Sequence, residues 1–88
     1  MIVKIDKSFE KDTNKIKDKS LLIKIANCIE SVRNADNLKS ISHLKKLKGS
    51  NNHYRISIGD YRIGIYIEKN QIDFIRFLHR KDIYNYFP

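Results

Sequence analysis

Three consecutive segments, His53–Ile58 (HYRISI), Tyr61–Glu68 (YRIGIYIE) and Gln71–His79 (QIDFIRFLH), decide the fold of this 88-residue chain. In the first two segments apolar and polar residues alternate, which is the pattern of a β-strand with one buried face. The dipeptides Gly59-Asp60 and Lys69-Asn70 separate the segments, and two residues are enough for a tight hairpin turn. This stretch therefore predicts a three-stranded antiparallel meander.

The residues before the meander predict one more strand and a helical hairpin. Residues 2–5 alternate and are rich in β-branched side chains, which favours a short first strand. A first helix is expected from Ser8, whose hydroxyl can cap it, to about Lys17, and a second is expected to begin at Asp18 or Ser20. The second helix has the clearest pattern, because its apolar residues recur at spacings of three and four and form one broad stripe. These residues are Leu21, Leu22, Ile25, Ala26, Cys28, Ile29 and Val32.

The second helix is expected to end near Asn34, and residues 35–52 have a mixed pattern. Within them, apolar residues recur every third position, which suits a short helical turn leading to a connector: Leu38, Ile41, Leu44 and Leu47. Residues 49–52 (GSNN) predict a loop. Residues 80–87 predict a short C-terminal helical turn.

Together these elements predict a single α+β domain over residues 1–88, in which the helical hairpin packs on a curved antiparallel sheet formed by the first strand and the meander. No apolar run approaches the roughly 20 residues of a membrane-spanning helix, and the N-terminus lacks the pattern of a signal peptide. Cys28 is the only cysteine, which excludes an intrachain disulfide framework. His43 and His53 have no partners at metal-ligand spacing. We therefore expect a cytoplasmic protein with no membrane contact, no metal and no other cofactor.

Positive charge is concentrated in the middle of the chain. The formal net charge is +8, which favours a polyanionic partner. Between Lys39 and Arg62 lie six basic residues, against the single acid Asp60. The segment that enters the meander is therefore the part of the chain most suited to a nucleic acid.

The hairpin register predicts which side chains share the sheet face opposite the helices. Two-residue turns place Arg55 opposite Gly64, and Gly64 opposite Ile75 on the next strand. The outward face is then basic with aromatic residues interleaved: His53, Arg55, Ser57, Arg62, Gly64, Tyr66, Phe77 and His79. Guanidinium groups suit phosphate and aromatic rings suit unstacked bases, so this face predicts RNA binding around a glycine hollow. The same register turns Arg76 toward the core, so either Arg76 lies at a sheet margin or a β-bulge intervenes.

Three segments resemble the RelE/ParE toxin family: Leu44–Gly49 (LKKLKG), Tyr54–Ile63 (YRISIGDYRI) and His79–Tyr84 (HRKDIY). The likeness covers nearly the whole chain. It implies two helices on a curved antiparallel sheet, and a toxin that cuts mRNA in the ribosomal A site as a metal-independent endoribonuclease. It also implies a cognate antitoxin from the same operon that neutralises the toxin.

Carried over residue by residue, the resemblance assigns catalysis to Arg62, His79, Arg80 and Tyr84. The two arginines would stabilise the charged phosphate, His79 would transfer a proton near neutral pH, and Tyr84 would orient the sugar or stack on a base. RNA binding is assigned to five further basic residues: Lys45, Lys46, Lys48, Arg55 and Lys81. Ser57 stands where the bacterial prototype has a second lysine, which removes one candidate general base.

Two other functions stay open at this point. A ParE-like toxin would inhibit DNA gyrase by binding, without cutting RNA, and it would share the fold. A non-toxic nucleic-acid-binding module would need only a spread of positive charge. The convergence of Arg62, His79, Arg80 and Tyr84 favours the nuclease, and the sequence leaves the oligomeric state open.

Overall fold

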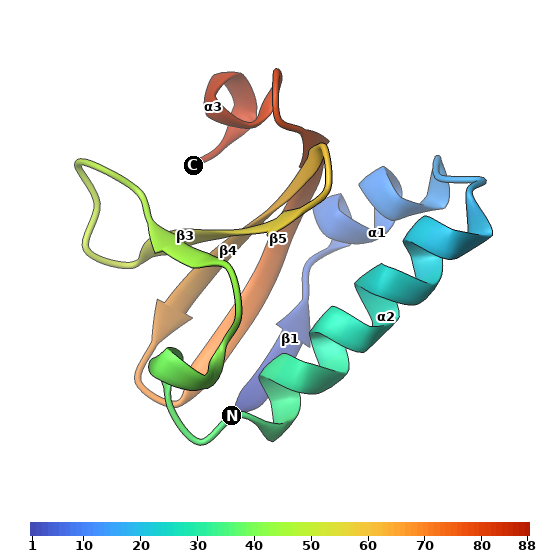
Figure 1. Cartoon of the computed structure of the whole chain (residues 1–88). Coiled ribbons are helices and arrows are strands. Elements are labelled where there is room, and N and C mark those ends of the chain that lie inside the picture. The colour runs from blue at the N-terminus through green and yellow to red at the C-terminus, as the bar shows by residue number, and fades with distance from the viewer.

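The computed structural model describes residues 1–88 and contains one five-stranded mixed sheet with helices on both faces (Figure 1). The strand order is β1-β5-β4-β3-β2. The helices α1 and α2 cover one face, and the short α3 lies over the other, which confirms the predicted α+β class. In chain order the elements are β1 (Ile2–Ile5), α1 (Lys7–Asn14), α2 (Lys19–Asn34), a 3₁₀ turn η1 (Leu38–Ser40), β2 (Leu44–Lys46), β3 (His53–Ile58), β4 (Tyr61–Glu68), β5 (Gln71–His79) and α3 (Ile83–Tyr86).

The first strand differs from the prediction in its direction. β1 runs parallel to β5, with Ile2 opposite Gln71 and Ile5 opposite Phe74. The sheet is therefore mixed, and the expectation of an all-antiparallel sheet is wrong for this one pair. A parallel pair needs a long crossover connection, which the helices and the rest of the sheet supply here. The alternating pattern of residues 2–5 carries no information about direction, so the sequence could not show it.

The two helices begin at aspartate caps. Asp6 Oδ2 accepts the backbone N–H of Ser8 at 3.3 Å, so the cap of α1 lies two residues before the predicted Ser8. The Ser8 hydroxyl instead donates to the carbonyl of Ile75 at 2.6 Å and docks α1 on β5. The second helix begins after Asp18, whose Oδ1 accepts the N–H of Leu21 at 3.3 Å. Its end at Asn34 confirms the prediction, and no helix combines the length and apolar character needed to cross a membrane.

The connector after α2 contains a strand that the sequence did not predict. The 3₁₀ turn η1 occupies only three residues, and β2 then pairs antiparallel with β3, with Leu44 opposite Ile56. The Leu47 N–H continues this pairing by donating to the His53 carbonyl at 2.9 Å. The three-residue apolar spacing predicted a helical turn, but the open edge of β3 offers backbone partners that override that local pattern.

The main core lies between the helices and the sheet. Phe9 of α1 meets Phe74 of β5 edge to face, with ring centroids 5.5 Å apart. The other fully buried side chains of this layer include Val32, Ile63, Ile65 and Ile72. The predicted stripe on α2 is narrower than expected, because Leu22 and Ala26 are exposed while Ile25 and Val32 are buried.

Candidate nucleic-acid interface

A β-bulge in β5 decides which side chains reach the sheet face opposite α1 and α2. The register follows the two-residue turn as far as Ile65 opposite Phe74, and then Gly64 pairs with Arg76. Ile75 is thus the extra residue, and every later residue of β5 moves to the opposite face from the one that an unbroken register gives. The bulge alternative for Arg76 is confirmed.

The bulge corrects the predicted positions of Phe77 and His79. Phe77 is buried in the main core opposite Ile63, and its ring stacks on Tyr61 at 4.9 Å with an interplanar angle of 2°. His79 pairs with Tyr61 and meets its ring edge at 5.5 Å. Both residues therefore lie on the face of the sheet that α1 and α2 cover. The prediction that they share a face with Arg55 is wrong, because one inserted residue reverses the alternation.

Most of the residues predicted to bind RNA gather in one pocket. Its volume is about 460 Å³, and it lies where β2, β3 and the C-terminal segment meet. The lining residues are Lys45, Lys46, Leu47, Lys48, Arg55, Tyr84, Phe87 and Pro88. Lys45 stands directly opposite Arg55 on the neighbouring strand, and no acidic side chain lines the pocket. Two like charges across a strand pair repel each other, so this arrangement favours a bound anion.

Two hydrogen bonds orient Arg55 within this pocket. Its Nε donates to the Tyr84 hydroxyl at 2.9 Å, and its Nη1 donates to the Ser57 hydroxyl at 2.6 Å. Arg55 has no carboxylate partner, so its charge is not neutralised by the protein. The sequence predicted only RNA binding for Arg55, and for Ser57 only the loss of a candidate general base. In the structure Arg55 lines the pocket, and a hydrogen bond to the Ser57 hydroxyl steadies its side chain.

The remaining predicted site residues gather at the Gly59-Asp60 turn. Arg62 lies opposite Ser57 on the same face as Arg55, but its Nη1 donates to the carbonyls of Gly59 and Tyr61 at 2.8 and 2.9 Å. Arg80 is exposed, with its Nε 3.8 Å from a carboxylate oxygen of Asp60. The structure thus brings Arg80 to the same end of the sheet as Arg62, and neither residue lines the pocket that contains Arg55 and Tyr84.

His79 has a defined orientation at this end of the sheet. Its Nδ1 accepts the backbone N–H of Lys81 at 3.2 Å. In a neutral imidazole the proton then resides on Nε2, which is the nitrogen left for another partner. The Lys81 side chain is exposed.

The predicted glycine hollow exists, but the chain fills it with its own aromatic ring. Phe87 is buried over Gly64, so close that a Cβ at that position would lie 2.7 Å from the Phe87 Cγ. Leu47, Ile83 and Phe87 form a second small core on this face. The signal for this close approach was available, since a glycine inside a central strand marks a place where something packs against the backbone. The hollow is therefore not an open platform for a base.

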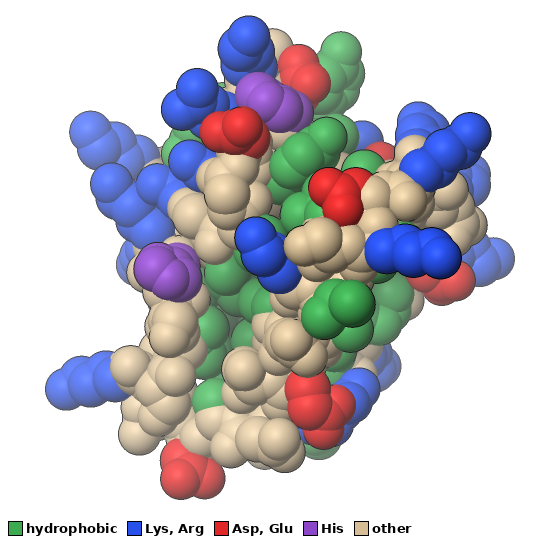
Figure 2. Space-filling model, turned by 45° about the vertical axis from the view of Figure 1, so that its right-hand side comes forward, with side chains coloured by type: hydrophobic (Ala, Val, Ile, Leu, Met, Phe, Trp, Pro, Cys, Tyr) green, Lys and Arg blue, Asp and Glu red, His purple; other side chains and the backbone are tan.

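Positive charge extends well beyond the pocket. In the view of Figure 2, Lys and Arg side chains project around the edge of the molecule, with hydrophobic surface between them. The net charge alone therefore does not locate a site. No group of three or more His, Cys, Asp or Glu side chains is close enough to hold a metal ion.

Comparison with known proteins gives matches that cover two thirds of this chain or more. Residues 3–84 match the family model described as the ParE toxin of type II toxin-antitoxin system, parDE. Toxin RelE3 of Methanocaldococcus jannaschii is 49% identical over 61 residues, which are 68% of this chain and 69% of that protein. The RelB-RelE antitoxin-toxin complex from Methanococcus jannaschii contains a chain with a TM-score of 0.81 and 40% identity, covering 97% of this chain and 99% of that one. The YoeB dimer from Staphylococcus aureus has a TM-score of 0.72 at 18% identity, covering 90% and 95% of the two chains, and so supports the fold alone.

Proposed function

We propose that this chain, which belongs to the family of ParE toxins of type II toxin-antitoxin systems, stops translation by cutting mRNA bound to the ribosome. The observation that carries the proposal is the Arg55–Tyr84 pair inside a pocket whose other charged residues are all lysines. A guanidinium and a phenol held together suit a phosphate and the sugar attached to it. The 49% identity to a protein named Toxin RelE3 supports the same activity.

The chemistry needs few groups, because RNA carries its own nucleophile. The 2′-hydroxyl attacks the adjacent phosphate and releases the 5′-oxygen of the next nucleotide. The protein has to hold the phosphate, stabilise the charge that develops on it and assist the proton transfers. Arg55 and Lys45 lie on neighbouring strands and would bind the two sides of one phosphate. Tyr84, whose hydroxyl lies 2.9 Å from Arg55 Nε, would contact the sugar at the reacting oxygen.

The residues at the Gly59-Asp60 turn take a different place in this proposal. Arg62 directs its Nη1 at two backbone carbonyls and does not line the pocket, whereas Arg55 does, so Arg55 is the better first ligand. His79, Arg80 and Lys81 lie at the end of the sheet and would contact RNA or the ribosome outside the pocket. The proposed catalytic centre thus moves from Arg62 and His79 toward Arg55 and Tyr84.

The proposed partners are ribosome-bound mRNA in the cytoplasm and a cognate antitoxin from the same operon. A structure of a related toxin, 40% identical, was solved as a RelB-RelE antitoxin-toxin complex. For the present chain an acidic antitoxin segment would match the cationic pocket. Such a segment would exclude RNA from the same groups and so explain neutralisation.

The test is to incubate the purified protein with programmed ribosomes and map the 5′ ends of the mRNA. We expect ribosome-dependent cuts, and a fall of about 10²–10³ in rate for Arg55→Ala, the loss typical when a charge-stabilising donor is removed. Tyr84→Phe should also slow cleavage while leaving the fold intact, because Tyr84 is 65% exposed. Arg33→Ala is the matched control. It removes an exposed arginine of α2, which lies on the other face of the sheet from α3, and Arg33 does not line the pocket. Absence of cleavage together with inhibition of gyrase supercoiling would replace this proposal with the ParE-like one.

A further inference from the structure

Arg76 lies at the margin of the candidate site without lining its pocket. The β-bulge turns Arg76 onto the face that carries α3, where Gly64 separates it from Arg55 in the same row of the sheet. β1 pairs with β5 only as far as Phe74, so β5 has an open edge at Arg76. Through this edge the Arg76 side chain reaches both layers that cover the sheet.

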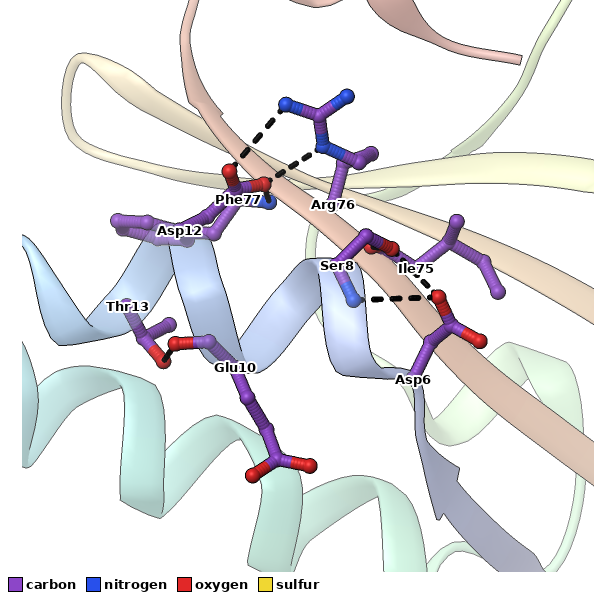
Figure 3. Close-up of polar contacts among 8 residues, drawn as sticks. All are labelled: Asp6, Ser8, Glu10, Asp12, Thr13, Ile75, Arg76 and Phe77. Carbon is purple, nitrogen blue, oxygen red and sulfur yellow. Dashed lines mark hydrogen bonds and ion pairs between the residues drawn. The ribbon is translucent and has the colours of Figure 1, made fainter.

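On one side, Asp12 of α1 holds the guanidinium (Figure 3). Asp12 is buried, and its Oδ2 accepts hydrogen bonds from Arg76 Nε at 2.7 Å and from the Phe77 N–H at 2.9 Å. Its Oδ1 accepts a further bond from Arg76 Nη2 at 3.2 Å. The hydrogen bond with Asp12 raises the pKa of Arg76 above its ordinary value. Arg76 is therefore a fixed cation whose charge is already matched, unlike Arg55.

On the other side, Arg76 faces the C-terminal helix. Its Cζ lies 6.0 Å from the centre of the Tyr86 ring, within the range of a cation–π contact. The helix α3 has only four residues, and Asp82 provides no side-chain cap. A helix this short is not stable in isolation, so contacts with the sheet must hold it.

Arg55 and Arg76 contact different sides of α3. Tyr84 and Tyr86 are two residues apart, which places them on nearly opposite sides of a helix. Arg55 donates a hydrogen bond to the Tyr84 hydroxyl, and Arg76 faces the ring of Tyr86. The two contacts add to the apolar packing of Ile83 and Phe87, which anchors this segment on the sheet, and they hold the two exposed tyrosine side chains.

We propose that Arg76 is a positioning residue for the site: clamped by Asp12, it holds Tyr86 and thereby fixes Tyr84 against Arg55. The inference rests on the proposed function, in which Tyr84 and Arg55 act on RNA. It adds that α1, on the far face of the sheet, sets the geometry of the pocket through one ion pair. A merely structural role would confine the Asp12–Arg76 pair to joining α1 to β5.

The first experiment measures the exchange rate of the Arg55 Nε proton by NMR, which needs no RNA. Tyr86→Leu removes the contact with Arg76 and leaves the Asp12–Arg76 pair intact. Because exposed cation–π contacts are weak, we expect the Arg55 Nε proton to exchange about two to five times faster. The conservative Tyr86→Phe keeps the ring and should retain the wild-type rate, as should Arg33→Gln, which breaks a surface ion pair with Glu30. Unchanged exchange in Tyr86→Leu, or equal acceleration in Arg33→Gln, would overturn the proposal.

The second experiment asks whether the effect on cleavage passes through Tyr84. Tyr86→Leu should reduce the cleavage rate by a similar two- to five-fold in the wild-type background, and should have no further effect when Tyr84→Phe is already present. Additive losses would overturn the positioning role. Failure of the wild-type protein to cut RNA would instead refute the proposed function, and the exchange measurement would still decide whether the contact between Arg76 and Tyr86 positions Tyr84.

Discussion

Replacing Gly64 with alanine tests the packing of the C-terminal segment on the sheet. An added Cβ would lie 2.7, 2.8 and 2.9 Å from three ring carbons of Phe87, whereas carbon atoms pack best at about 3.5–4.0 Å. Gly64 does not have the positive φ that disfavours alanine, so the nearest obstacle to the added Cβ is the ring of Phe87. Either the ring leaves its place, or the strand and the ring both shift.

The magnitude follows from the burial of Phe87. The residue is 4% exposed, and burying a phenylalanine side chain contributes about 1.5–3 kcal/mol to the free energy of unfolding. If the ring stays and is overpacked, the cost is about 1–3 kcal/mol. Both routes predict a less stable variant, with Tm lower by about 4–8 °C for each kcal/mol lost in a domain of this size. Urea and thermal unfolding followed by circular dichroism would measure the change.

The sign of the effect should reverse when Phe87 is absent. In a Phe87→Ala background the obstacle is gone, and Gly64→Ala should raise the free energy of unfolding by about 0.5–1 kcal/mol, because glycine destabilises a strand interior relative to alanine. A double-mutant cycle at these two positions therefore gives a clear answer. If Gly64→Ala has the same effect in both backgrounds, the Phe87 ring does not lie over Gly64 and the reasoning is refuted.

Three further predictions concern other parts of the molecule. Asp12→Asn should lower the free energy of unfolding by about 1.5–3 kcal/mol, the value of hydrogen bonds to a charged group, and an unchanged urea midpoint would contradict this. Burial raises the pKa of the Cys28 thiol to about 11 from an ordinary value of 9.0, so the unfolded chain loses this proton first and stability should fall as the pH rises from 9 to 11. Cys28→Ala should lack that fall when unfolding is measured across the same range, and identical profiles for both proteins would refute the assignment. Lys45→Ala should weaken RNA binding and reduce the slope of log affinity against log salt by about one, which titrations at several salt concentrations would detect; an unchanged slope would show that Lys45 contacts no phosphate.

Local patterns predicted the meander and α2 well. The alternation in β3 and β4 and the two dipeptide turns are properties of neighbouring residues, which is why the register could be predicted. The structure confirms that Arg55 lies opposite Gly64. The direction of β1 and the existence of β2 depend on which partner strands are available. These are tertiary facts, and residues 2–5 and 44–46 do not encode them locally.

The site was harder to predict, because one inserted residue changed it. The apparent misplacement of Arg76 was the only sign of the bulge, and the bulge carried Phe77 and His79 to the other face. The contact between Arg55 and Tyr84 joins residues 29 positions apart and depends on the placement of α3. The resemblance to a toxin family identified Tyr84 as important, whereas only the structure shows which arginine it meets.

The pairing of β1 with β5 has a consequence for how the protein is made. β5 is the last strand to be synthesised, and it pairs with both β1 and β4. Contacts between residues so distant in sequence close late and slow the folding of a domain. A nascent chain that stops before β5 lacks the partner for its first strand and cannot seat α3. The pocket, which Tyr84 and Phe87 complete, therefore forms only after β5 has joined the rest of the sheet.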